Sequence, residues 1–218
     1  MGGTMQLSNR TAIVVAIVAV IAIIGSVTPG YAAQRSIGKV SQKAYIGAYG
    51  TPAGGSQSAL YYNDKVYQQE LVRTIENGRT VIRFLDRTKL QLGSASELVL
   101  DTFVYDPDES AGEMLVNLGP GAFRFITGKL KFREGFQFKT PLVAIGVRGT
   151  VFLVTVAANG ATQVAVLDGE VEVAPLDGSD GAVINANQTG TVTGPGSAVS
   201  VTAGTGISTD PGLDDNPY

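Results

Sequence analysis

Carboxylates, hydroxyls and lysines are the side chains with which this sequence could do chemistry, because the chain of 218 residues contains no Cys and no His. Without Cys it has no disulfide, no thiolate nucleophile and no zinc site of the usual structural kind. Without His it has no Ser-His-Asp triad and no histidine-bound transition metal. Carboxylate or Ser/Lys catalysis, oxygen-bound cations and binding remain. We therefore expect a non-enzyme without a cofactor.

Four carboxylates are candidates for a glycan-cleaving pair, in which one acid protonates the leaving group while the other assists. They are Asp86, Asp101, Glu134 and Asp168. Each stands where a turn or a strand edge would place an acid in any case, and their spacing reveals no pair. A glycan-active enzyme is therefore the weakest of three functional hypotheses.

A second acidic group could bind Ca²⁺ through its oxygen atoms. It consists of Asp106, Asp108, Glu109 and Glu113. These residues lack the regular alternation of a calcium loop, and Pro107 stiffens the segment. The favoured interpretation is a solvated acidic loop without a metal.

Residues 12–24 are an unbroken run of Ala, Ile and Val that follows a single basic residue, Arg10. A Pro/Gly break and small residues come next, which is typical of a secretory signal peptide. Cleavage after Ala32 would place Gly30 at the −3 position. An uncleaved anchor is the alternative, but the run is shorter than the ~20 residues that cross a membrane. We expect a periplasmic, secreted or cell-surface protein.

From Arg35 onward the sequence alternates apolar and polar residues with a period of two and shows no helical period. The dipeptides Asn77-Gly78, Asn159-Gly160 and Asp168-Gly169 separate β-rich runs and favour two-residue hairpin turns. The predicted fold class is all-β: an antiparallel sandwich, a β-roll or a short solenoid of about ten short strands, preceded by an N-terminal signal helix.

The sequence divides into four parts. They are a signal peptide at 1–32, a lead-in at 33–43, a β domain at 44–193 and a flexible tail rich in Gly, Ser and Asp at 194–218. Within the domain, the apolar segment 142–156 predicts two buried strands, joined or bent at its glycines, at the centre of the core.

Charge is divided unevenly along the chain. Residues 33–148 carry 15 basic and 11 acidic side chains, whereas residues 149–218 carry 8 acidic side chains and no Lys or Arg. The favoured interpretation is drift in a solvated tail. The alternative is electrostatic attraction between copies, which would give a self-associating surface protein in head-to-tail assemblies. The overall charge of −3 argues against nucleic acid as a partner.

Five tyrosines gather in the first part of the predicted domain. They are Tyr45, Tyr49, Tyr61, Tyr62 and Tyr67. Tyrosine is favoured at interfaces, so these residues are a candidate surface for a protein or a saccharide. Packing of edge strands explains them equally well, and both interpretations stay open.

The runs Phe136–Pro141, Ala144–Thr150 and Phe152–Val154 resemble the FecR domain, whose most specific element here is Gly146-Val-Arg-Gly-Thr150. Weaker matches extend the resemblance over residues 44–193. The family motif residues are Thr140, Pro141, Gly146, Val147, Arg148, Gly149 and Thr150.

The resemblance implies an extracytoplasmic all-β domain without enzymatic activity. In the founding members this domain relays receptor occupancy to a sigma factor. Only about ten residues precede the apolar run of this chain, too few for a cytoplasmic sigma-regulator region. We therefore expect a stand-alone exported FecR domain that acts as a protein–protein interaction module of the envelope, in signalling or scaffolding.

The motif also has a physical interpretation. Thr140-Pro141 is expected to begin a strand, where the missing N–H of proline does no harm. Gly146 and Gly149 would let the backbone bend. Arg148 lies in an apolar run, so its guanidinium needs partners. We expect it to pin neighbouring turns through carbonyls or a carboxylate, rather than to contact an anion or a partner.

Overall fold

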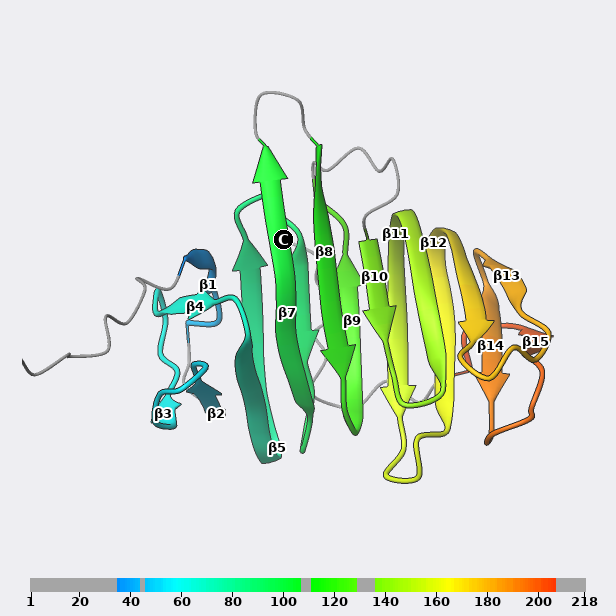
Figure 1. The fold of residues 1–218 in the computed structure, drawn as a ribbon, viewed down its shortest axis with the longest axis horizontal. Helices are drawn as coiled ribbons and strands as arrows, with labels where there is room; N and C mark the ends of the chain where they lie inside the picture. The colour runs from blue at the N-terminus through cyan, green and yellow to red at the C-terminus, as the bar shows by residue number, and fades with distance from the viewer. Residues whose placement is uncertain (1–34, 44–45, 107–110, 129–135, 207–218) are drawn as a thin grey trace, which may run out of the picture. The chain divides into compact units, whose positions relative to one another are not determined.

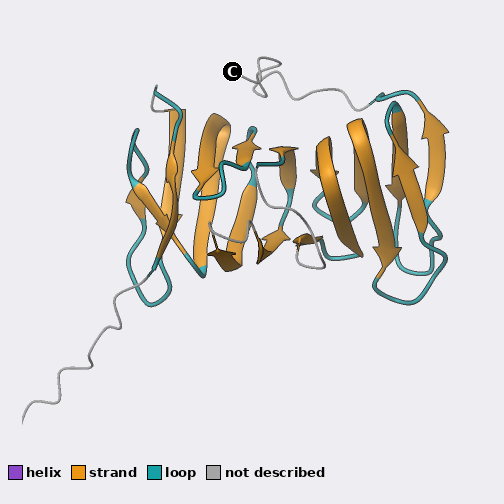
Figure 2. Cartoon of the chain, turned by 90° about the horizontal axis from the view of Figure 1, so that it is seen from above, coloured by secondary structure: helices purple, strands orange, loops and turns teal. Residues whose placement is uncertain are grey.

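The computed structural model describes residues 35–43, 46–106, 111–128 and 136–206. These residues form fifteen β-strands and no helix (Figures 1 and 2), which confirms the predicted all-β class. They accordingly include no helix with the length and apolar character needed to cross a membrane. The predicted signal helix and the cleavage site at Ala32 lie outside the described residues.

The strands vary in length from two to fifteen residues. In chain order they are β1 (Ser36–Val40), β2 (Ile46–Thr51), β3 (Ser58–Ala59), β4 (Lys65–Tyr67), β5 (Glu70–Phe84), β6 (Lys89–Leu92), β7 (Glu97–Asp106), β8 (Ala111–Leu118), β9 (Gly121–Ile126), β10 (Phe136–Lys139), β11 (Val143–Val156), β12 (Thr162–Pro175), β13 (Ala182–Asn185), β14 (Gln188–Val192) and β15 (Ser200–Ala203).

Seven strands form a closed ring of hydrogen-bonded neighbours. The order around the ring is β5, β7, β8, β10, β11, β9, β6 and β5 again. The β8–β10 pair is parallel, and the other pairs are antiparallel. Strands β12, β14 and β15 continue the sheet beyond β11, while β1 and β2 pair with β5. Each strand of the ring therefore has a hydrogen-bonded neighbour on both sides over at least part of its length.

The strands form two layers that face each other across the core. Three long strands belong to both layers, since each passes from one layer to the other. The front layer comprises β7, β8, β10 and β13 with residues 70–73, 143–148 and 170–175 of the long strands β5, β11 and β12. The back layer comprises β6, β9, β14 and β15 with the remaining halves of the same three strands. Figure 1 shows β7, β8 and β10 of the front layer side by side.

Each long strand bends where one residue has a positive φ angle. These residues are Asn77 (58°), Gly149 (63°) and Gly169 (82°). A Cβ atom on Gly169 would lie 2.6 Å from the Cγ2 atom of Thr150, so the bends of β11 and β12 nest closely. The predicted hairpins at Asn77-Gly78 and Asp168-Gly169 are therefore wrong: the positive φ serves a bend within a continuous strand and not a reversal of the chain. The turn at Asn159-Gly160 is confirmed between β11 and β12.

Aromatic side chains join the two layers. The ring of Phe138 in the front layer lies 4.0 Å from that of Phe125 and 5.4 Å from that of Phe152, both in the back layer. All three side chains are fully buried. The apolar segment 142–156 does lie at the centre of the core, as one strand bent at Gly149.

Two strands lie where the sequence indicated no regular structure. Strand β15 is inside the predicted tail and pairs with β14, and β1 is inside the predicted lead-in and pairs with β4 and β5. All four side chains of β15 are exposed, so no apolar alternation marks it. The predicted acidic loop is shorter than expected, because β7 continues to Asp106 and Glu113 belongs to β8.

Candidate functional site

The Thr140-Pro141 part of the family motif forms the turn between β10 and β11. The expectation that it begins a strand is therefore wrong. The Thr140 hydroxyl oxygen accepts the backbone N–H groups of Leu142 (3.3 Å) and Val143 (3.1 Å), which caps the turn. The Thr162 hydroxyl donates to the same oxygen over 3.0 Å and ties the turn to β12. The turn is thus held in place by hydrogen bonds.

The remaining motif residues lie in β11. Val147 is in the core, Gly149 forms the bend and Thr150 is buried beside it. The side chain of Arg148 lies outside what the structure describes, so its role as a pin stays a prediction.

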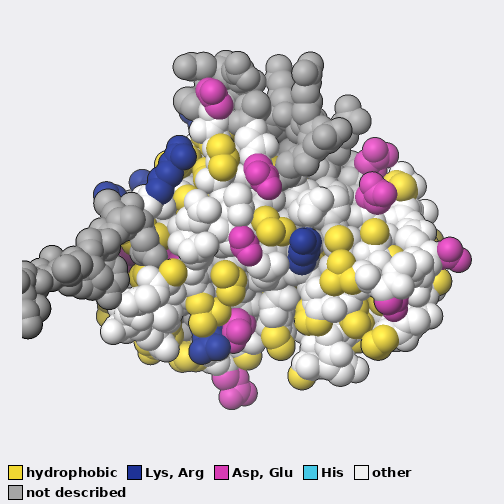
Figure 3. All heavy atoms as spheres, in the orientation of Figure 1, with side chains coloured by type: hydrophobic (Ala, Val, Ile, Leu, Met, Phe, Trp, Pro, Cys, Tyr) yellow, Lys and Arg dark blue, Asp and Glu magenta, His cyan; other side chains and the backbone are white. Residues whose placement is uncertain are grey.

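A groove of about 320 Å³ opens beside the Thr140-Pro141 turn, on the outer face of the front layer. Its centre is a row of cross-strand neighbours, Val99 on β7, Asn117 on β8 and Lys139 on β10. Residues directly opposite in neighbouring strands project to the same side of the sheet. The complete lining is Glu97, Leu98, Val99, Asn117, Leu118, Gly119, Lys139, Thr140 and Pro141. Figure 3 shows this side of the molecule, with hydrophobic side chains interspersed among single charges.

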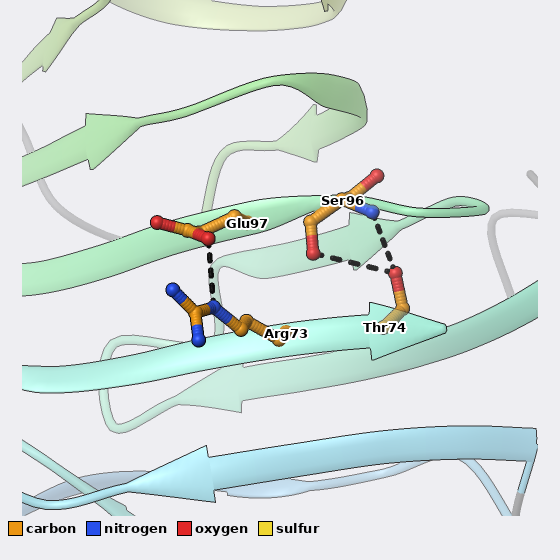
Figure 4. Close-up of polar contacts among 4 residues, drawn as sticks. All are labelled: Arg73, Thr74, Ser96 and Glu97. Atoms are coloured by element: carbon orange, nitrogen blue, oxygen red, sulfur yellow. Dashed lines mark hydrogen bonds and ion pairs between the residues drawn. The ribbon is translucent and has the colours of Figure 1, made fainter. Parts of the chain in front are cut away.

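Some polar groups of the groove already have partners within the chain, whereas others are available to a bound molecule. The Asn117 amide donates to a carboxylate oxygen of Asp101 over 2.9 Å, which leaves the amide carbonyl as an acceptor for a bound group. The Nε atom of Arg73 donates to Glu97 over 2.7 Å and neutralises that carboxylate (Figure 4). Within the described part of the chain no carboxylate forms an ion pair with Lys139. The centre of the groove therefore offers a cation and an acceptor.

A hydrogen-bonded network holds the groove end of β7. The Thr74 hydroxyl oxygen accepts the backbone N–H of Ser96 over 2.9 Å (Figure 4) and donates to the carbonyl of Gly93 over 2.6 Å. The Ser96 hydroxyl oxygen in turn accepts the backbone N–H of Ala122 over 3.0 Å. Because Ser96 precedes Glu97, this network fixes the start of β7 against β5 and β9.

The structure exposes only part of the predicted tyrosine surface. Tyr61 and Tyr62 are 55% and 47% exposed on the turn that precedes β4. Tyr49 on β2 and Tyr67 on β4 are half-buried, and Tyr45 lies outside the described residues. The exposed aromatic candidates are therefore two neighbouring residues.

A buried carboxyl group, Glu70, has no counterpart in the sequence-based analysis. Its side chain is 2% exposed at the start of β5 and accepts the backbone N–H of Tyr67 over 2.7 Å. Burial raises the pKa of Glu70 from 4.5 to about 7, against the opposing effect of that hydrogen bond. Gly50 leaves room for the carboxyl group, because a Cβ atom there would collide with it. The pairing of β2 with β5 creates this site, and no local motif marks it.

The three candidate catalytic carboxylates that the structure describes form no accessible pair with one another. Asp86 is fully buried and accepts the backbone N–H (3.0 Å) and hydroxyl (2.5 Å) of Thr88, while burial raises its pKa. Asp101 binds Asn117, Asp168 lies at the bend of β12, and Glu134 is outside the described residues. A saccharide could not reach Asp86.

Acidic side chains are concentrated on β12 and the turn after it. They are Asp168, Glu170, Glu172, Asp177 and Asp180. Asp177 accepts the backbone N–H groups of Gly196 (2.5 Å) and Ser179 (3.0 Å), which lowers its pKa to about 2. Among the residues that the structure describes, no three Asp or Glu side chains form a cluster that could hold a metal ion. Asp108 and Glu109 of the proposed Ca²⁺ group lie outside these residues.

Comparisons with known proteins place this fold. Two crystal structures of a protein provisionally described as an anti-sigma factor, from Parabacteroides distasonis ATCC 8503, are similar to it, with TM-scores of 0.51 and 0.50 at 17% and 16% identity. Each match covers 62% of this chain and 59% of that chain. At this identity the likeness concerns the fold alone. No curated protein matches the chain.

Residues 70–172 match the family model described as FecR protein. The match begins at the first residue of β5 and ends in β12, so it includes the closed ring of strands, the Thr140-Pro141 turn and the groove beside it. The family model thus confirms, over residues 70–172, the resemblance to the FecR family that the motifs predicted.

Proposed function

We propose that this chain is an exported, non-enzymatic FecR-domain protein that binds a protein partner in the bacterial envelope, in signalling or scaffolding. The groove beside the Thr140-Pro141 turn is the observation that carries the proposal, because a hydrogen-bonded family motif supports an open surface there. The description of the structural relatives as anti-sigma factors agrees with a regulatory role.

The chemistry of the groove favours an extended, acidic segment of the partner. Lys139 would pair with a carboxylate, and the free carbonyl of Asn117 would accept an N–H group. Val99 and Pro141 offer an apolar surface for one small hydrophobic side chain. Charge-assisted contacts set orientation, and the apolar contact contributes most of the affinity.

Photo-crosslinking in living cells tests this function. A benzoylphenylalanine at position 117 should capture a second protein in the groove. The same group at Asn185, exposed on β13 of the same layer, is the control. The capture from position 117 should disappear with Lys139→Glu. Capture of the same protein from both positions, or persistence with Lys139→Glu, would contradict binding in the groove.

Self-association is the second candidate, favoured by the distribution of charge. The acidic side chains of β12 lie on the strand that joins the ring at β11. Lys39, Lys65 and Arg83 are exposed on β1, β4 and β5, where β1 joins the ring at β5. Head-to-tail contact between these regions would form an open assembly. Light scattering should then show a polymer that dissolves above ~0.5 M salt, where charges are screened within a few ångströms. A monomer at low and high salt excludes this candidate.

A further inference from the structure

A row of side chains crosses the outer face of the back layer, on the side opposite the core. The row consists of direct cross-strand neighbours on β6, β9, β11, β12 and β14. They are Gln91, Arg124, Leu153, Ala165 and Thr189. We call this row the back stripe.

The back stripe is buried although it points away from the core. Arg124 and Gln91 are each 7% exposed, and Ala165 is fully buried. Leu153 and Ala165 pack with Ala122 in a small hydrophobic cluster separate from the main core. An arginine on the free face of a sheet normally keeps its guanidinium in water. The low exposure of these side chains indicates that another segment covers this face of the sheet.

The side chain of Gln91 carries an unmatched acceptor within the stripe. The side-chain carbonyl oxygen of Gln91 is buried and accepts no hydrogen bond. An unmatched buried acceptor is destabilising, so we expect the covering segment to supply a hydrogen-bond donor. Arg124 lies beside Gln91 in the ladder, and Lys89 follows two residues away on β6. The covering segment should therefore bring an N–H group and negative charge.

We propose that residues 207–218 of this chain bind across the back stripe. This segment contains Asp210, Asp214 and Asp215 and no Lys or Arg, so its charge complements Arg124 and Lys89. It also contains Leu213, which suits the apolar part of the stripe. A backbone N–H of the segment donates to the free oxygen of Gln91.

The path of the chain supports this occupant. The Thr189 hydroxyl at one end of the stripe donates to the carbonyl of Gly204 over 2.7 Å, so the chain leaves β15 beside the stripe. From β14 to β6 the stripe crosses four inter-strand spacings, about 19 Å. Twelve extended residues reach about 40 Å. Residues 207–218 can therefore reach both Arg124 and Lys89. The proposal is independent of the groove on the front layer.

A single introduced thiol tests the proposal, because the chain has no native Cys. Ala165→Cys places the thiol in the stripe, and Thr189→Cys is the second position in case Ala165→Cys perturbs the fold. In the full chain the thiol should react slowly with a soluble disulfide reagent. In a chain that ends at residue 206, which keeps every described strand, the rate should rise at least about tenfold. Ala144→Cys on the front layer should react equally in both chains.

Three further measurements identify the occupant. The triple variant D210N, D214N, D215N should expose the thiol at least in part, and a synthetic peptide of residues 207–218 should protect it again in the shortened chain. Equal rates in the full and shortened chains would overturn the proposal. Protection that grows with protein concentration would assign the face to a second copy, and protection seen only in cell extract would assign it to another protein; either result would also overturn it.

Discussion

The outer faces of the two layers differ although both belong to one ring of strands. On the front layer the central row is Val99, Asn117 and Lys139, half-buried and bordered by a groove. On the back layer the central row contains Ala165 and Thr189, and even Arg124 is nearly inaccessible.

The difference shows how side-chain size at equivalent ladder positions decides the use of a face. Small residues such as Ala122, Ala165 and Thr189 permit another segment to approach the backbone closely. The longer Asn117 and Lys139 stand clear of the front sheet and leave space between them. One face is thus suited to a partner from outside, and the other to a segment of the same chain.

Of the substitutions considered, removal of the aromatic contact between the layers should lower the free energy of unfolding most. Phe138→Ala deletes the ring that contacts Phe125 and Phe152, and should lower the free energy of unfolding by about 3–5 kcal/mol. Urea denaturation measures this loss. Because the ring connects the faces, the thiol at Ala165→Cys should become reactive as well. A loss below about 1 kcal/mol would show that the layers do not depend on this contact.

Two buried carboxyl groups near opposite ends of β5 should make the stability of the fold depend on pH. Glu70 has a pKa raised from 4.5 to about 7, so the folded state binds its proton more tightly than the unfolded state. The contribution of Glu70 to stability is therefore fully present below pH 4.5 and falls by about 3 kcal/mol as the pH rises to about 7, at 1.36 kcal/mol for each pKa unit.

Glu70→Gln should remove this decline, which thermal melts between pH 4 and 8 would measure. A smaller decline of the same sign should remain, because burial also raises the pKa of Asp86, just beyond the other end of β5. An unchanged pH profile in Glu70→Gln would contradict the assignment.

Gln91→Leu should change the free energy of unfolding by about 1 kcal/mol, and the sign of this change should depend on whether residues 207–218 are present. In the shortened chain the substitution removes an unmatched buried acceptor and should stabilise the fold. In the full chain the gain should vanish or reverse, because a hydrogen bond from the covering segment is lost. Gln163→Leu, exposed on β12 of the same layer, should be neutral in both chains. If Gln91→Leu changed the free energy of unfolding equally in the two chains, residues 207–218 would not contact Gln91.

The smallest effect on stability is expected in the groove. Lys139→Glu should change the free energy of unfolding by less than about 0.5 kcal/mol, because Lys139 has no ion pair among the described residues. The same substitution should abolish the crosslink from position 117. A loss above about 1 kcal/mol in urea denaturation would make Lys139 a structural residue and remove it from the binding surface.

The β class and the core could be predicted from the sequence, whereas the bends in the long strands could not. Alternation marked the strands, and the family motif lies in β10, β11 and the turn between them. Asn77-Gly78 and Asp168-Gly169 were predicted as hairpin turns because positive φ serves hairpin turns and bulges alike. Only the pairing of each strand half with a different neighbour distinguishes the two.

The groove and the buried Glu70 could not be predicted, because strands distant in sequence create both. Asn117 and Lys139 become neighbours through the parallel β8–β10 pair, and Glu70 meets Gly50 through the β2–β5 pair. Strand β15 could not be predicted for a different reason. Its ladder with β14 holds it in the sheet, and its side chains carry no apolar signal.

The most direct test compares the two faces in one protein preparation. Asn117→Cys and Ala165→Cys each place a single thiol at the centre of one face, and both rates of reaction with the same reagent are measured in the full chain. We expect the thiol at position 117 to react at least about tenfold faster than the thiol at position 165. Equal rates, or a faster reaction at position 165, would contradict an open front face and a covered back face.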